Sequence, residues 1–137
     1  METVKIFLDT NIVLDFFSGR MGDNKAKTIV ASGQDTKIEL CISILTAINV
    51  LYVASKYAPF LKASDISVLF RILTMDFQQF SDAKTLGLDD FEDALQIECA
   101  KSNGCTAIVT RDKARLNSGL HLPLILSPEE YLSKIGL

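Results

Sequence analysis

The sequence predicts an α/β fold, a single three-layer α/β/α domain with a mostly parallel central sheet. Short apolar segments with strand propensity alternate with amphipathic segments of helical spacing along the whole chain. The 137 residues, 48% of them hydrophobic, are enough to bury a core without disulfides. No linker, repeat or low-complexity segment interrupts the pattern, so we expect one domain over residues 1–137.

The first half of the chain predicts two strands and four helices. Ser43 and Ser64 are suitable N-caps, whereas Gly33 and Pro59 end helices because neither residue continues one well. In chain order we expect strand 4–8, helices 12–17 and 24–32, strand 38–42, and helices 44–57 and 64–73.

The second half predicts a weak strand and a short helix before the remaining elements. Gly104 ends a helix that opens near Asp90, and Ser127 and Pro128 carry the signals that start a terminal helix. We expect strand 74–77, helices 81–86 and 90–103, strands 106–109 and 124–126, and a helix after Ser127.

Composition excludes several classes of protein. No apolar run approaches the roughly 20 residues of a membrane span, and no signal peptide precedes Asp9, so we expect a cytoplasmic protein without a membrane partner. The net charge of −3 predicts no broad nucleic-acid platform. Three widely spaced cysteines indicate buried thiols, and the lone His121 gives little support to Ser-His or Cys-His catalysis.

Carboxylates follow two predicted strands at the point where each strand ends. Asp9 follows the run that closes with Leu8, and Asp112 follows Val109 by three residues. Because the carboxyl ends of parallel strands lie at one edge of a sheet, we expect Asp9 and Asp112 to converge there. The alternative for Asp9 is a solvated strand end or an N-cap of the helix that follows.

A third group of acids opens the helix predicted near residue 90. Asp93 shares a helix face with Ile97 and Ala100, where a carboxylate is costly unless it is paired or bound to a metal. Asp90 suits either a functional role or simple complementarity to the helix dipole. For the neighbouring Asp89 and Glu92 our interpretation is complementarity to the helix dipole. Clustered carboxylates without His or Cys favour Mg²⁺ or Mn²⁺, ions that activate water and stabilise charge on a phosphodiester.

Three motifs together resemble those of PIN domains, specifically the small bacterial VapC-like toxin ribonucleases. These motifs are Leu8-Asp9-Thr10-Asn11-Ile12-Val13-Leu14-Asp15, Asp90-Phe91-Glu92-Asp93-Ala94-Leu95 and Val109-Thr110-Arg111-Asp112. Their order and spacing extend the resemblance over essentially the whole chain, and it implies a PIN-like fold.

The resemblance also implies a function, an endoribonuclease that depends on Mg²⁺ or Mn²⁺. It implies that Asp9, Asp93 and Asp112 hold the metal and that Asp90 is an additional catalytic acid. It further implies a homodimer and a cognate antitoxin that covers the active cleft. The residues that it assigns to supporting hydrogen bonds are Thr10, Asn11 and Thr110.

One position departs from the family pattern. A glutamate is usual on the helix after the second strand, and Asn49 stands there in this sequence. An amide can coordinate or donate a hydrogen bond but cannot neutralise a metal. Our hypothesis is that Asp90 supplies the missing charge; the alternative for Asn49 is an ordinary helix-surface amide.

Local basic residues are the candidates for contact with RNA phosphates. Arg111, Lys113 and Arg115 flank Asp112, although each is also explained by a solvated surface charge. Two other functions remain open. One is a PIN-like binding module that has lost activity with its glutamate; the other is a phosphatase of the haloacid dehalogenase type, although Asn11 stands where those enzymes carry a second aspartate.

Overall fold

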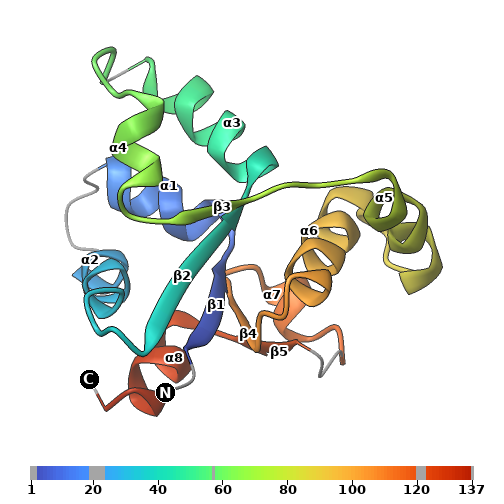
Figure 1. The fold of residues 1–137 in the computed structure, drawn as a ribbon. Coiled ribbons are helices and arrows are strands. Elements are labelled where there is room, and N and C mark those ends of the chain that lie inside the picture. Colours follow the sequence, from blue (N-terminus) through green and yellow to red (C-terminus); the bar gives the residue numbers. More distant parts are fainter. Residues whose placement is uncertain (1–2, 19–23, 57, 120–122, 137) are drawn as a thin grey trace.

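The sheet at the centre of the molecule has five strands, all parallel. The computed structural model describes residues 3–18, 24–56, 58–119 and 123–136. The strands are β1 (Val4–Leu8), β2 (Ile38–Ser43), β3 (Arg71–Leu73), β4 (Ala107–Val109) and β5 (Leu124–Leu126). Their order is β3-β2-β1-β4-β5, with β1 central (Figure 1). This confirms the predicted α/β class and makes the sheet parallel throughout the described residues.

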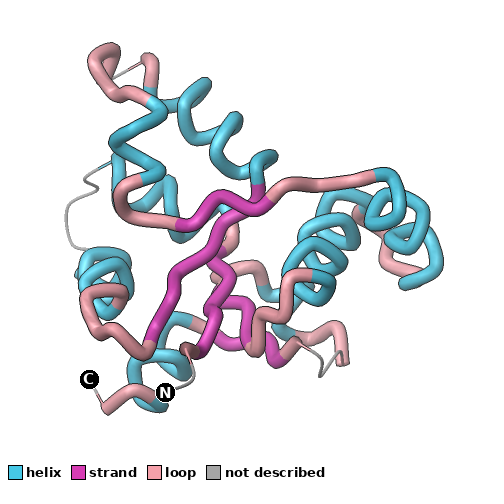
Figure 2. Tube along the Cα trace, in the orientation of Figure 1, coloured by secondary structure: helices cyan, strands magenta, loops and turns pink. Residues whose placement is uncertain are grey.

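Helices cover both faces of the sheet, which Figure 2 shows as a band of strands between two groups of helices. One group packs its apolar residues against one face and comprises α1 (Thr10–Ser18), α2 (Asn24–Ser32), α3 (Ile44–Ala54), α4 (Ala63–Ser67) and α8 (Pro128–Lys134). The other face is covered by α6 (Phe91–Ser102), on which α5 (Phe77–Ala83) and the 3₁₀ turn η1 (Lys84–Leu86) pack. The short α7 (Lys113–Leu116) follows β4.

The alternation of side chains along the strands divides the core in two. In β1, Ile6 and Leu8 pack with the first helix group, whereas Phe7 points to the α6 side. Ile108 of β4 likewise lies on the α6 side and is fully buried. Cys41, Cys99 and Cys105 are free and buried, as expected, and burial raises the pKa of the Cys99 thiol to about 12.

Several predicted helix ends are confirmed by their hydrogen bonds. The Ser43 hydroxyl accepts from the Thr46 amide at the start of α3. Ser127 and Glu130 form a capping box at the start of α8. Gly104 follows α6 with a φ of 75°, a conformation that favours glycine over residues with a Cβ.

The region between α3 and α6 differs from the prediction. The expected helix 64–73 stops at Ser67, and Arg71–Leu73 form β3 in parallel register with Cys41–Ser43 of β2. The physical reason is that Phe70 and Leu73 bury on opposite faces of the sheet, which one helix face does not allow. The expected strand 74–77 is wrong, and α5 begins at Phe77, capped by Asp76, instead of near residue 81. The sequence also gave no sign of α7.

Parallel strands bring the first residues after β1 and β4 to one edge. Phe7 and Leu8 pair in register with Ile108 and Val109, so Asp9 and Thr110 are neighbours at the carboxyl end. The Asp9 amide donates to the Val109 carbonyl at 3.0 Å, which extends the ladder to this point. No helix in the described part of the chain combines the length and apolar character that crossing a membrane requires.

Replacing Ile108 by alanine tests the core on the α6 side. Ile108 is 0% exposed, so Ile108→Ala should lower the free energy of unfolding by about 2–5 kcal/mol through lost burial and a residual cavity. Val68→Ala, at a position 79% exposed, is the control and should change it by less than about 0.5 kcal/mol. Urea denaturation measures both, and equal effects would contradict the assigned packing.

Candidate functional site

Asp9 is the buried centre of the site at the carboxyl end of β1. Its side chain is held by three neighbours that the strand ends bring together. One carboxylate oxygen, Oδ1, accepts from the Thr10 amide at 2.8 Å. The other, Oδ2, accepts from Thr110 Oγ1 at 2.6 Å and from Asn11 Nδ2 at 3.2 Å. Thr10, Asn11 and Thr110, to which the resemblance assigns supporting hydrogen bonds, therefore each contact the Asp9 carboxylate.

Arg115 of α7 joins Asp9 to Asp93 of α6. Its Nη1 lies 2.6 Å from Asp9 Oδ1, and its Nη2 donates to Asp93 Oδ1. Arg115 is 5% exposed and Asp9 4%, whereas the Asp93 side chain is 17% exposed. Burial by itself lowers the pKa of the Arg115 guanidinium, but Asp93 and Asp9 outweigh burial and raise that pKa. We call these two ion pairs the Arg115 bridge.

A buried hydroxyl network lies behind Asp9 and fixes the start of α1. Thr10 Oγ1 is 2.8 Å from Thr46 Oγ1, which also accepts from Gln96 Nε2 at 3.1 Å and from Ser43 Oγ at 3.3 Å. Because Thr46 Oγ1 accepts two of these bonds, its proton is directed to Thr10. The network ties α3 and α6 to the loop that carries Asp9.

Sequence reasoning missed this network and the position of Arg115. A signal for Gln96 was available, since it follows Asp93 by three residues on the inner face of α6 and is fully buried. No such signal existed for Arg115, because α7 has only four residues and no readable periodicity.

The other predicted acids cap helices. The Asp90 side chain is exposed and accepts from the amides of Glu92 and Asp93 as the N-cap of α6. Asp112 accepts from the Ala114 amide as the N-cap of α7, and its own amide donates to Thr110 Oγ1. Asn49 is half-buried on α3, three residues after Thr46, and no hydrogen bond within the described ranges joins it to Asp9 or Asp93.

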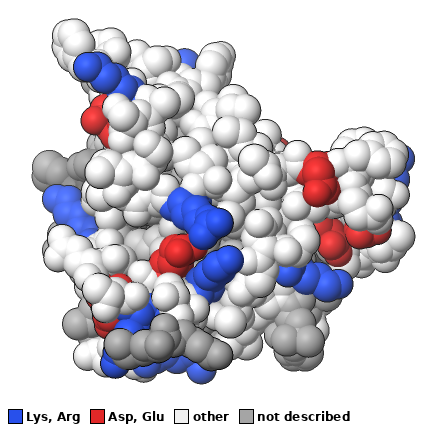
Figure 3. Space-filling model, in the orientation of Figure 1, with Lys and Arg blue, Asp and Glu red and all other residues white. Residues whose placement is uncertain are grey.

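Two of the three basic residues expected at the substrate are engaged with carboxylates. Arg115 is buried in the bridge and is not the solvent-exposed charge that the sequence suggested, because two acids stabilise its charge inside the protein. Arg111 forms a two-point ion pair with the buried Asp15, at 2.7 and 3.0 Å. Lys113 is exposed. Figure 3 shows small basic and acidic groups scattered over a largely uncharged face.

The arrangement of these side chains does not fit a divalent metal ion. Among the described residues, no three His, Cys, Asp or Glu side chains gather closely enough to hold one. Both Asp9 oxygens already have partners, and the guanidinium of Arg115 takes the place between Asp9 and Asp93 where a cation would neutralise them. The acids suit Mg²⁺ or Mn²⁺ in kind, but the geometry is that of an ion-paired site.

The parallel sheet, with three acid-bearing motifs at one edge, is the architecture of a PIN domain. Residues 5–114 match the PIN domain family. The chain therefore belongs to that family, and VapC-type toxin ribonucleases are among its homologues.

Individual relatives extend over nearly the whole chain. Ribonuclease VapC1 of Aquifex aeolicus (strain VF5) is 28% identical over 147 residues, which cover 98% of this chain and 97% of the relative. A solved toxin-antitoxin complex from Klebsiella pneumoniae contains a chain with a TM-score of 0.69 and 23% identity, covering 90% of this chain and 97% of that one. The structure of VapC20 of Mycobacterium tuberculosis, a sarcin-ricin loop cleaving toxin, has a TM-score of 0.66 and 16% identity. The match covers 84% of this chain and 95% of that one. Both structures support the fold.

Thr110 provides a test of how firmly Asp9 is held. Thr110→Val keeps the shape but removes the hydroxyl that donates to the Asp9 carboxylate, so it should lower the free energy of unfolding by about 1–3 kcal/mol. Thr110→Ser should retain most of the stability because the donor remains. Thr106→Val, at an exposed position, is the matched control. Chemical denaturation that finds Thr110→Val as stable as the parent would contradict the assigned bond.

Proposed function

We propose that the protein is a metal-dependent endoribonuclease, the toxin of a toxin-antitoxin pair, that hydrolyses RNA phosphodiester bonds. The observation that carries this proposal is the position of Asp9 and Asp93, which lie far apart in the sequence but are joined through Arg115 at the carboxyl edge of a PIN-domain sheet. Several hydrogen-bond donors hold the buried Asp9 carboxylate in a defined position. Catalysis requires such a defined position, whereas stability alone does not. The relation to ribonuclease VapC1 supports RNA as the substrate class.

Each acid of the site has a role in this proposal. Asp9 and Asp93 are the principal catalytic carboxylates, with Asp112 as a third metal ligand at the next strand end. A Mg²⁺ or Mn²⁺ ion held by these carboxylates would supply an activated water and would stabilise the charge on the phosphodiester. Thr10, Asn11 and Thr110 orient Asp9 through its carboxylate and backbone neighbours, and Lys113 contacts a phosphate.

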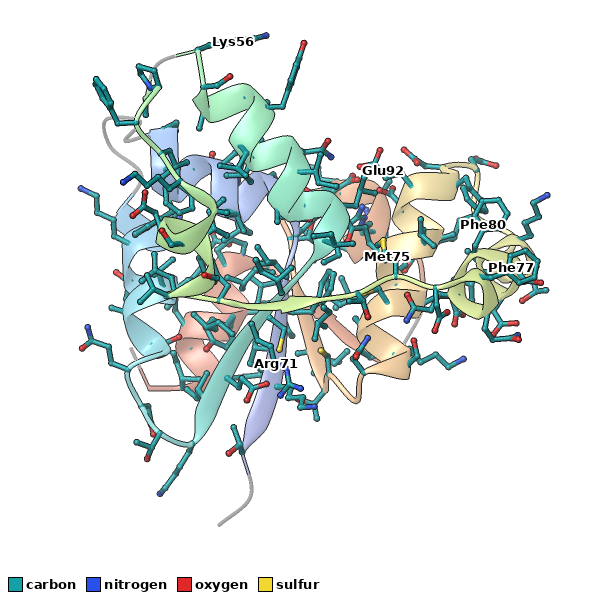
Figure 4. The ribbon with its side chains drawn as sticks, turned by 45° about the horizontal axis from the view of Figure 1, so that its top comes forward. Lys56, Arg71, Met75, Phe77, Phe80 and Glu92 are labelled. Atoms are coloured by element: carbon teal, nitrogen blue, oxygen red, sulfur yellow. The ribbon has the colours of Figure 1, made fainter. Side chains whose placement is uncertain are left out.

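We also infer a cognate antitoxin and a homodimer as partners. The related fold in the Klebsiella pneumoniae toxin-antitoxin complex supports the antitoxin. Exposed apolar side chains support a covered surface: Phe77 is 79% exposed and Phe80 45%, both on α5 (Figure 4), and Tyr52 of α3 is 68% exposed. Phe80 stacks with Phe77 and packs edge-on against Phe91 of α6, so these three aromatic side chains form one continuous patch.

Cleavage of a structured RNA in the presence of Mn²⁺ tests the activity. Asp9→Asn and Asp93→Asn should each lower the cleavage rate by roughly 100-fold or more, since several kcal/mol of transition-state stabilisation depend on the site. Asp35→Asn is the matched control, because Asp35 is exposed and lies before β2, at the opposite edge of the sheet. Circular dichroism establishes that each variant is folded before its rate is compared.

The outcomes separate the candidate functions. Cleavage by the parent and by Asp35→Asn, lost in the two site variants, supports the ribonuclease. Absent cleavage in the parent, or equal cleavage in all four proteins, favours the inactive binding module. Hydrolysis of a small phosphomonoester that depends on Asp9 would favour the phosphatase.

Asp90→Asn distinguishes the charge of Asp90 from its capping role. Asparagine caps a helix about as well as aspartate, so the variant should keep its free energy of unfolding within about 0.5 kcal/mol. If Asp90 compensates for Asn49, the variant loses Mn²⁺ affinity and cleavage rate together. Unchanged affinity and cleavage would make Asp90 a helix cap only.

A further inference from the structure

We infer that Arg115 excludes the divalent cation from its own site: the cation enters between Asp9 and Asp93 only when the Arg115 side chain leaves. The inference concerns metal binding and rests on the proposed function, which assigns a metal to this acidic pair. It resolves the mismatch between acids suited to Mg²⁺ and a geometry already completed by a guanidinium.

Electrostatics makes the guanidinium and the metal alternatives. The Arg115 bridge uses Oδ1 of Asp9 and Oδ1 of Asp93, so one positive charge already joins the two carboxylates. Arg115 is 5% exposed, and a guanidinium stays protonated in proteins. A divalent ion beside a buried guanidinium would meet like-charge repulsion that little water screens. The pair therefore accommodates one of the two cations at a time.

Arg115 is held by charge more than by a complete set of hydrogen bonds. Its Nε is buried and has no hydrogen-bond partner in the part of the chain that the structure describes. Its Nη1 reaches Asp9 at ion-pair distance without hydrogen-bond geometry. The desolvation cost of a buried donor without a partner is not compensated by a hydrogen bond. This cost favours release of the Arg115 side chain once another cation binds the acids.

The surroundings of Arg115 offer a place for the released side chain. A cavity of about 190 Å³ lies against it, lined also by Asp89, Asp90, Asp93 and Ala114. Asp89 and Asp90 are exposed, so a guanidinium that turns into this cavity reaches solvent while it remains near carboxylates. Arg115 lies on α7, a single turn of four residues, and its release from the two acids needs only a movement of its side chain.

Mn²⁺ binding, measured by the electron paramagnetic resonance signal of the free ion, tests the inference without any activity assay. Arg115→Met keeps much of the side-chain volume and removes the charge, so its affinity for Mn²⁺ should exceed that of the parent by about tenfold or more. Arg71→Met is the matched control, because Arg71 is exposed and pairs with Glu39. Arg115→Met combined with Asp9→Asn should lose the gain, which locates the ion at this pair.

Equal affinity of parent and Arg115→Met, or no binding by either, would overturn the inference. A gain that persists without Asp9 would overturn it as well. RNA cleavage is a separate readout: tighter Mn²⁺ binding by Arg115→Met together with an absence of cleavage in every protein refutes the ribonuclease but leaves the exclusion of the cation standing.

Chemical modification of the parent protein keeps the inference testable if Arg115→Met does not fold. Phenylglyoxal reacts with accessible guanidinium groups, and mass spectrometry follows each arginine separately. Arg115 should react slowly without a divalent ion and faster as Mn²⁺ is added, whereas the exposed Arg71 should react at one rate throughout. An Arg115 rate that stays constant across the Mn²⁺ titration would refute the exchange.

Discussion

The Arg115 bridge is the interaction on which the geometry of the site depends. It joins the end of β1, the first turn of α6 and the single turn of α7 through one buried guanidinium. Two carboxylates without that charge would repel each other across a poorly screened space. Buried ion pairs contribute little net stability compared with apolar packing, but loss of one partner is costly because the other charge stays buried. The bridge therefore specifies the positions of Asp9 and Asp93 more than it stabilises the fold.

The sheet supplies the other half of this specification. Parallel pairing of β1 with β4 sets Asp9 beside Thr110, and the hydroxyl network from Thr46 fixes the turn that follows Asp9. These contacts come from rigid elements, whereas Arg115 projects from a helix of four residues. One acid is thus held by strands and long helices, and the cation that completes the pair is held by the least extensive element at this edge.

Sequence patterns predicted the parts of the site that regular elements position. An apolar run that ends in Asp9 marks a strand end, and Asp93 on the stripe of Ile97 marks an inward carboxylate. Patterns failed where a pairing across the fold decided the outcome. The spacing of Phe70 and Leu73 satisfied a helix, but pairing with β2 made a strand, and Arg115 resembled a surface charge beside Asp112. Burial of the Arg115 guanidinium can be predicted only when the positions of Asp9 and Asp93 in the fold are known.

Exchange of Arg115 for a metal ion would change the charge of the site in two ways. In the bridged arrangement Asp9 and Asp93 exceed Arg115 by one negative charge, and Arg111 is paired with Asp15, so the phosphate of the proposed substrate would meet an unfavourable edge. A divalent ion held by Asp9 and Asp93 would balance the charge of both carboxylates. Its binding would also release the Arg115 guanidinium beside them, where a two-point contact with phosphate would become available. The substrate role suggested for Arg115 and its buried position in the bridge would then correspond to two states of one side chain, selected by the ion.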